Sequence, residues 1–135
     1  MKASLDHINM TVKNLKESVY WYGKYFGFNL VEEGVSTSGI YAVLQSGESM
    51  LCLHEMQRSV ALDDSAVADR YHRIYHFALR IEDRKAWQRL FATEDFVITY
   101  ESPTHYPHSM SWYIADPNGH QIEVVSWNEN KVSFA

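Results

Sequence analysis

Hydrophobic and polar residues follow two different periods along the chain. In some stretches they alternate, which predicts β-strands, because successive side chains of a strand point to opposite faces. In others the apolar residues recur every three or four positions, which predicts helices. The first half reads as a strand, a helix over 14–27 and three further strands. The strands are expected near residues 5–12, 28–33, 39–46 and 49–56.

The helix expected over 14–27 has clear signals at both ends. Asn14 is a favourable N-cap, Glu17 stands three residues later in capping-box position, and Gly27 can end the helix. The stripe predicted to face the core consists of Leu15, Val19, Tyr22 and Phe26.

The second half repeats this order. After a long polar connection over 57–73, with room for a helical turn, a strand is expected at 74–81 and a helix at 82–92 capped by Asp83. Its inward residues are expected to be Trp87, Leu90 and Phe91. Strands should follow near 96–101, 109–115 and 120–127. A period of half the chain indicates an internal duplication.

The two halves align at an offset of 69 residues, which takes His7 to His76 and His54 to Glu123. Each of these residues alone says little, but imidazoles and a carboxylate at repeat-equivalent positions would converge if the two sheets face one cavity. Such a ligand set suits a divalent first-row metal with positions left for substrate. Because the imidazoles must be neutral, metal binding is expected to weaken below about pH 6.

Composition narrows the classes of partner and compartment. The 135 residues suit a single domain, and 12 basic against 17 acidic side chains without a basic run argue against nucleic acid. One cysteine, Cys52, excludes an internal disulfide. Neither a signal-peptide core nor a stretch of about 18 apolar residues stands out, so we expect a cytoplasmic protein without a membrane partner.

The paired strand-helix-strands modules, opened by His7 and His76 and closed by "DPNGHQIEVV" (116–125), resemble the vicinal oxygen chelate superfamily. That group includes glyoxalase I, fosfomycin-resistance thiol transferases, extradiol dioxygenases and bleomycin-resistance proteins. The resemblance implies an α+β fold in which two βαβββ modules form a mixed, partly open barrel, commonly completed by homodimerisation. Module 1 would span about 3–56, the linker 57–73, module 2 about 74–127 and the tail 128–135.

The resemblance also implies a metal at the centre of the fold. By position, His7, His76 and Glu123 match the ligands that metal-dependent members share, and His54 lies on the strand that supplies a further ligand in glyoxalases. Fe2+ or Mn2+ is favoured, whereas Zn2+, Ni2+ and Co2+ are also compatible with such ligands. An ion there would explain why Glu123 faces inward, because an unpaired buried carboxylate is costly.

The stretch from His105 to Glu123 resembles the extradiol dioxygenase signature, with Tyr113, Asp116, Pro117 and Gly119 at matching places. It departs from that signature at Pro103 and Trp112. The resemblance implies that Tyr113 and either His105 or His108 supply hydrogen bonds to the substrate. His54 resembles the acid/base histidine of those enzymes, a role that excludes its being a metal ligand through the same nitrogen.

The choice of reaction depends on cations. No Lys or Arg lies between Arg89 and Lys131, which we interpret as the lack of a partner for a phosphonate or a glutathione carboxylate. This favours a small aromatic, catecholic substrate and extradiol-type cleavage. The alternatives are a glyoxalase-type lyase or thiol transferase acting on a small electrophile, and a metal-free protein that sequesters a small molecule.

Overall fold

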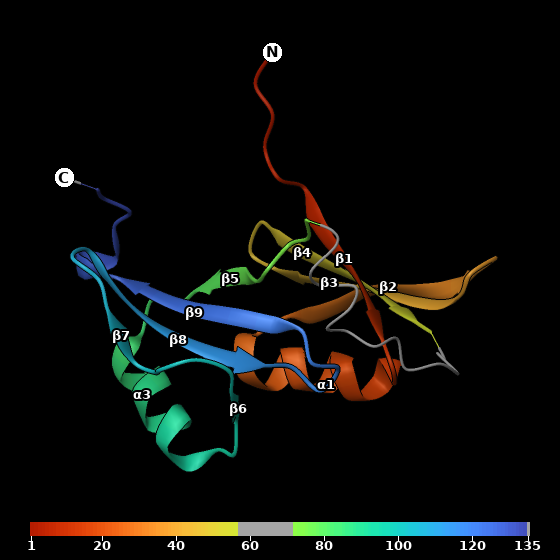
Figure 1. The fold of residues 1–135 in the computed structure, drawn as a ribbon. Coiled ribbons are helices and arrows are strands. Elements are labelled where there is room, and N and C mark those ends of the chain that lie inside the picture. The colour runs from red at the N-terminus through yellow and green to blue at the C-terminus, as the bar shows by residue number, and fades with distance from the viewer. Residues whose placement is uncertain (57–71, 135) are drawn as a thin grey trace. The chain divides into compact units, whose positions relative to one another are not determined.

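A computed structural model describes residues 1–56 and 72–134, which fall into two compact units of similar size (Figure 1). Each unit has the predicted order of strand, helix and further strands. The predicted linker and its helical turn lie almost entirely outside the described residues, at 57–71. In the first unit the elements are β1 (His7–Val12), α1 (Leu15–Phe26), β2 (Asn29–Ser36), β3 (Gly39–Ser46) and β4 (Ser49–Glu55).

The first sheet is mixed, with the strand order β1-β4-β3-β2. β1 runs parallel to β4, and the other two pairings are antiparallel. One face packs on α1 and is apolar, because alternate residues such as Met10, Leu44 and Leu53 point toward the helix and are buried. Tyr22 of the helix is fully buried against them. The other face of the sheet is half-buried to exposed and mixes polar and apolar residues.

The predicted ends of α1 are confirmed. The side chain of Asn14 accepts a hydrogen bond of 2.9 Å from the backbone N–H of Glu17. Gly27 takes the left-handed conformation with φ 68°, and its N–H donates back to the last turn. The buried stripe differs from the predicted one, because Ser18 is buried whereas Val19 and Phe26 are half-buried.

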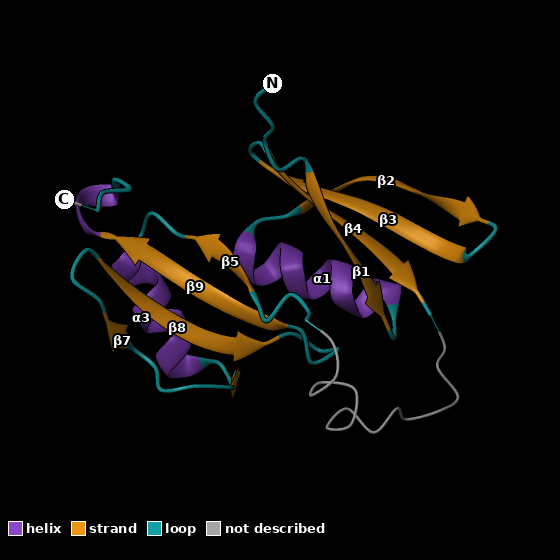
Figure 2. Cartoon of the chain, turned by 45° about the horizontal axis from the view of Figure 1, so that its top comes forward, coloured by secondary structure: helices purple, strands orange, loops and turns teal. Residues whose placement is uncertain are grey.

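The second unit repeats the plan. Its sheet has the order β5-β9-β8-β6, with β7 added to β8, and β5 runs parallel to β9 (Figure 2). The helix covers the apolar face: Trp87 and Trp112 pack edge to face at 6.3 Å, and Asp83 caps the helix through the N–H of Ala86. The elements are β5 (Phe77–Arg80), α3 (Arg84–Thr93), β6 (Val97–Ile98), β7 (Thr104–His105), β8 (Ser109–Ala115) and β9 (Gln121–Trp127), followed by a short 3-10 helix, Asn128–Asn130.

The strand expected at 96–101 is the main departure from the predicted elements. Only β6, Val97–Ile98, forms within it, and a second two-residue strand, β7, lies beyond it at Thr104–His105. The reason is local: the hydroxyl of Ser102, rather than a backbone carbonyl, accepts the N–H of Tyr113 at 2.7 Å, and Pro103 has no N–H to offer the sheet. The ladder therefore breaks between the two short strands.

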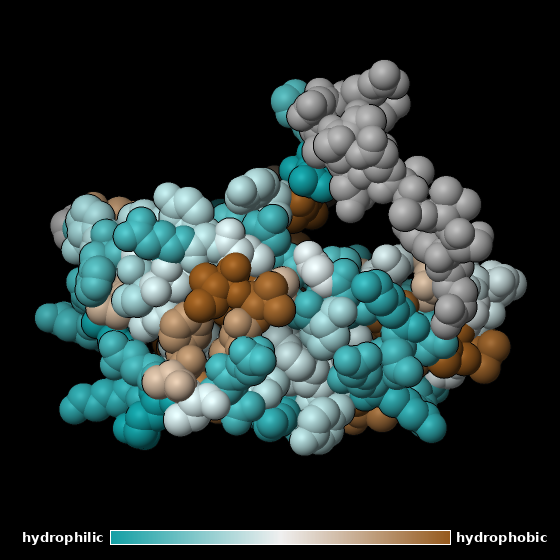
Figure 3. All heavy atoms as spheres, turned by 60° about the horizontal axis from the view of Figure 1, so that its bottom comes forward, coloured by the Kyte–Doolittle hydropathy of each residue, from teal (hydrophilic) through white to brown (hydrophobic). Residues whose placement is uncertain are grey.

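On the face drawn in Figure 3, hydrophobic side chains lie in small patches among hydrophilic ones. Within the described residues, no helix combines the length and the apolar character needed to cross a bilayer.

Candidate functional site

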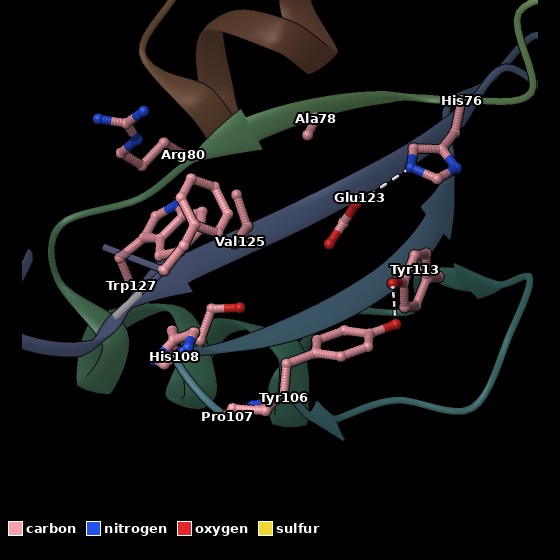
Figure 4. Close-up of a pocket in the computed structure, with 12 residues that line it drawn as sticks. His76, Ala78, Arg80, Tyr106, Pro107, His108, Tyr113, Glu123, Val125 and Trp127 are labelled. Atoms are coloured by element: carbon pink, nitrogen blue, oxygen red, sulfur yellow. Dashed lines mark hydrogen bonds and ion pairs between the residues drawn. The ribbon is translucent and has the colours of Figure 1, made fainter. Parts of the chain in front are cut away.

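The open face of the second sheet carries a cavity of about 710 Å³ (Figure 4). Its floor is built by alternation, because every second residue of β5, β8 and β9 points away from the helix. A wall is added by the segment 106–108, which precedes β8. The charged or hydrogen-bonding residues on this surface include His76, Arg80, Tyr106, His108, Tyr113 and Glu123.

His76 and Glu123 form the polar centre of the cavity. The Nε2 atom of His76 lies 3.0 Å from the Oε2 atom of Glu123, and the two side chains are 30% and 20% exposed. The other oxygen of Glu123 accepts a hydrogen bond of 2.6 Å from the hydroxyl of Ser111, which is fully buried. Ser111 therefore orients the carboxylate and leaves one of its oxygens facing the imidazole.

An imidazole nitrogen and a carboxylate oxygen at this distance need a positive charge or a proton between them. A divalent ion fits, because ligand distances of about 2.1 Å would place two adjacent ligands of an octahedral ion about 3.0 Å apart. The Nδ1 atom of His76 is buried and has no hydrogen-bond partner within the described residues. No second contact therefore fixes the tautomer, and the proton can reside on Nδ1 when Nε2 binds a cation.

The pair supplies two ligands rather than a complete site. Within each described unit, no three His, Cys, Asp or Glu side chains gather in a group that could hold a metal ion. Structural zinc sites need four protein ligands and catalytic sites at least three. A metal at His76 and Glu123 would need a further ligand from elsewhere.

Tyr113 lies beside this pair and is joined to a second tyrosine. Its ring centroid is 5.9 Å from that of His76, and its hydroxyl lies 2.7 Å from the hydroxyl of Tyr106. Burial, the hydrogen bond to Tyr106 and the negative charge of Glu123 raise the pKa of Tyr113 well above its ordinary value. The hydroxyl therefore stays protonated at neutral pH and serves as a hydrogen-bond donor.

The structure distinguishes His105 from His108, between which the sequence left the choice open. His108 lines the cavity, whereas His105 lies exposed on β7 and is not among the described residues that line it. Trp127 also lines the cavity, whereas Trp112 is buried on the helix side of the sheet. Strand alternation explains the position of Trp112, because on β8 its side chain points to the face opposite that of Ser111 and Tyr113.

Arg80 corrects the interpretation that the second module offers no cation. It lies on β5 and lines the cavity. The span without Lys or Arg, between Arg89 and Lys131, does not include the first strand of the module, on which Arg80 lies. Alternation from His76 through Ala78 would have found it, because residues two apart on a strand share a face.

In the first unit, His7 and His54 lie on the open face of the sheet but not side by side. The ladder pairs His7 with Met50 and Thr11 with His54, so the two histidines are four residues apart, about 13 Å along the strands. The Nδ1 atom of His54 lies 3.1 Å from the side-chain oxygen of Asn9. The Nδ1 atom of His7 lies 2.7 Å from a carboxylate oxygen of Asp6.

The ladders also correct the alignment of the repeats. His7 and His76 are equivalent, yet Leu53 pairs with Met10 in the first sheet and Val124 pairs with Leu79 in the second. The last strands are therefore related by an offset of 71 rather than 69. This register puts Cys52, not His54, at the place of Glu123. Loops of different length between the strands cause the shift, and a single offset cannot represent it.

Asp116, one of the residues at matching places in the extradiol dioxygenase signature, has a structural role. It is buried, and its carboxylate accepts hydrogen bonds from the backbone N–H groups of Asn118 at 2.8 Å and His120 at 2.9 Å. Gly119 has φ 88°, which favours glycine. These residues hold the turn that sets the register of β9 and hence the position of Glu123.

Three residues of the site were missed from the sequence: Ser111, Tyr106 and Arg80. Because residues two apart on a strand share a face, Ser111 could have been predicted from Tyr113 on β8, and Arg80 from Ala78 on β5. Tyr106 precedes β8 in an irregular segment, where no periodicity indicates direction.

The duplicated strand-helix-strands units, each with one open sheet face, define a class of proteins built from two similar α+β modules. The chain matches the family model of the Glyoxalase/Bleomycin resistance protein/Dioxygenase superfamily over residues 4–124. It therefore belongs to this family, the vicinal oxygen chelate superfamily, and the predicted α+β fold class is confirmed.

Solved structures of related fold cover nearly the whole chain. A glyoxylase/bleomycin resistance protein/dioxygenase domain from Frankia sp. EAN1pec matches with a TM-score of 0.74 at 15% identity, covering 97% of this chain and 96% of that one. The fosfomycin resistance protein FosX from Listeria monocytogenes gives 0.67 at 19%, covering 98% and 100%. TioX from Micromonospora sp. ML1 gives 0.65 at 17%, covering 93% and 100%. A comparison with curated proteins found no match.

Proposed function

We propose that this protein is a divalent-metal-dependent enzyme whose substrate binds in the cavity of the second unit. The observation that carries the proposal is the pair His76 and Glu123, 3.0 Å apart, with the carboxylate oriented by Ser111. His7, the repeat equivalent of His76, is the proposed third ligand. His54 stays a prediction, either as a fourth ligand or as an acid/base group.

Fe2+ or Mn2+ is the proposed ion, because two imidazoles and a carboxylate suit either and leave positions open. FosX, which shares the fold, was crystallised with Mn(II). A bound ion would polarise substrate oxygen atoms and hold them at one point.

The residues around the pair supply the proton chemistry. Tyr113 remains protonated and donates a hydrogen bond to a substrate oxygen, while Tyr106 holds its hydroxyl in position at 2.7 Å. His108 lines the same cavity and, when neutral, can accept a proton from a substrate hydroxyl. Donor and acceptor are thus both available beside the proposed metal ligands.

The first reaction we propose is extradiol-type cleavage of a catechol by molecular oxygen. The placement of Tyr113 beside His76, on the strand before that of Glu123, supports it together with the sequence signature. A catechol presents two adjacent oxygens to the ion and a hydroxyl proton to the base, which matches the groups in the cavity.

A second candidate is a glyoxalase-type lyase or thiol transferase that acts on a small electrophile. Arg80 favours it, because a cation in the cavity removes the objection that an anionic substrate would lack a partner. A metal-free protein that sequesters a small molecule is the outcome if no ion binds.

Parallel assays distinguish these functions. Protein purified without oxygen and analysed for metal is given catechol, oxygen and Fe(II) in one assay. In the other it is given methylglyoxal, glutathione and Ni(II) or Zn(II). Yellow ring-fission product supports the dioxygenase, and thioester formation supports the lyase. Ligand binding by a protein that takes up no metal contradicts both.

The two histidines of the signature can be separated in the active assay. His108→Ala should lower kcat by about 100-fold, the typical contribution of a positioned base, because His108 lines the cavity. His105→Ala should change kcat by less than about twofold. Equal losses in both variants would contradict the assignment of the base.

We also propose that the protein forms a homodimer, as the family resemblance implies. Sedimentation equilibrium measures this directly, and a monomer at micromolar concentration would contradict it.

A further inference from the structure

We infer that the substrate carries a carboxylate that binds Arg80, joined by a short apolar spacer to the group that binds at His76 and Glu123. This inference rests on the proposed function of the same cavity and assigns a specificity-determining residue to it.

The order of residues along β5 and β9 sets the distance between the two ends of the cavity. Ala78 and Arg80 share one face of β5, His76 directly precedes that strand, and all three line the cavity. The ladder pairs Ala78 with Glu123 and Arg80 with Val125. Arg80 therefore stands two residues, about 7 Å, further along the sheet than the level of Glu123. The cavity has a polar end at His76 and a cationic end at Arg80 (Figure 4).

The cavity floor between these two ends is apolar and is formed by short side chains. Ala78 and Val125 line the cavity there and offer no hydrogen-bonding side chain. Beyond them, Trp127 packs edge to face on Phe134 at 5.2 Å and closes the far end with an aromatic surface. A ligand that extends from the polar end to Arg80 must cross this surface, so its middle should be apolar.

Arg80 is not committed to the fold, in contrast to a second arginine nearby in the sequence. Arg84 donates to the hydroxyl and carbonyl of Ser126 at 2.9 and 3.1 Å and to Asn128 at 3.1 Å. Within the described part of the chain, the guanidinium of Arg80 makes neither a hydrogen bond nor an ion pair, although its backbone lies in the ladder with β9. An exposed guanidinium that lines a cavity and has no such partner is available to a ligand.

A carboxylate fits this end better than a phosphate group. The guanidinium offers two parallel N–H donors that match the two oxygens of a carboxylate. A phosphate dianion would add charge near Glu123 and is commonly bound by several cations, whereas Arg80 is the one Lys or Arg among the described residues that line this cavity. A singly charged acid is therefore the expected class.

The test compares an acid with its neutral ester. The probes are 3-(3,4-dihydroxyphenyl)propanoate, in which a ring and two carbons separate the hydroxyls from the carboxylate, and its methyl ester. Isothermal titration calorimetry measures both with metal-free and with Mn(II)-loaded protein. We expect the acid to bind about tenfold more tightly than the ester in either form, the effect of one charge-assisted hydrogen bond.

Variants identify the cation. Arg80→Gln should remove the preference for the acid, and Arg80→Lys should restore part of it. Arg89→Gln removes the same charge from an exposed position on α3 outside the cavity and should leave the preference unchanged.

The outcomes separate this inference from the proposed function. If loaded protein binds acid and ester equally, the Arg80 site is wrong while the metal site stands. If the acid is preferred through Arg80 but Mn(II) has no effect on either probe, the metal-dependent function is wrong and the Arg80 site stands. If neither probe binds to protein shown to be folded, both are contradicted.

Discussion

The open sheet faces of the two units carry different chemistry on the same framework. In the second unit the last strand presents Glu123 to His76 at 3.0 Å, whereas the equivalent place in the first unit holds Cys52. The buried faces agree closely: Leu51 corresponds to Ile122, and Leu53 to Val124, and all four are buried. The packing against the helix has thus been retained in both units, while the open faces have diverged.

The largest expected effect comes from removing the carboxylate that distinguishes the two faces. Glu123→Gln keeps the shape of the side chain and its contact with Ser111 but loses the charge, so Mn(II) affinity should fall by at least about 100-fold, since even outer-shell partners contribute about 10–100-fold. Cys52→Ser, at the equivalent place, should change it by less than about twofold. Calorimetric titration measures both, and equal effects would contradict the difference between the units.

Ser111 tests the orientation of that carboxylate. Ser111→Ala removes the hydrogen bond of 2.6 Å to Glu123 without touching the oxygen that faces His76. We expect Mn(II) affinity to fall by about tenfold, the usual effect of removing a group that orients a ligand. Unchanged affinity would show that the carboxylate is held by other contacts.

The helix caps give a smaller and more symmetric effect. Asn14 and Asp83 each accept a backbone N–H at 2.9 Å at the start of α1 and α3. Asn14→Ala and Asp83→Ala should each lower the free energy of unfolding by about 1 kcal/mol in urea denaturation. Mn(II) affinity should stay the same, and a loss of binding in either variant would link the caps to the site.

Tyr113 is expected to have the smallest effect near neutral pH and a larger one in alkali. Burial first, and then the hydrogen bond to Tyr106 and the charge of Glu123, raise its pKa in the folded state. The folded state therefore keeps the proton while the unfolded chain releases it above about pH 10. This contribution to stability is complete below that pH and is lost as the pH rises through the folded pKa.

Tyr113→Phe removes this titration. In urea denaturation between pH 8 and 11, the free energy of unfolding should fall less steeply for Tyr113→Phe than for the unmodified protein. Parallel slopes would contradict the raised pKa. Tyr106→Phe should give an intermediate slope, because it removes the hydrogen bond but leaves the burial.

Local patterns in the sequence predicted much of the fold. Strand alternation located β3 and β8, and the caps at Asn14 and Asp83 located the starts of both helices. The shortening of the strand expected at 96–101 to β6, and the separate strand β7, were not predictable, because the side chain of Ser102 interrupts the ladder there.

The site was less predictable, because register and direction are tertiary properties. The sequence identified His76, Glu123, Tyr113 and His108, all of which line the cavity, and strand alternation accounts for Tyr113 and Glu123. The sequence alone could not show that the last strands of the two repeats are related by an offset two residues larger than the first strands. This larger offset makes Cys52, rather than His54, the equivalent of Glu123. That difference arises from strand pairing across loops, which no local period records.

Counting bound Mn(II) ions by electron paramagnetic resonance tests whether His7 joins His76 and Glu123 in holding one ion, as we propose. We expect one tightly bound ion per chain in the unmodified protein and none in His7→Ala or His76→Ala, with both variants folded by circular dichroism. A full complement of bound ion in His7→Ala would contradict it, as would the absence of a tight site in the unmodified protein.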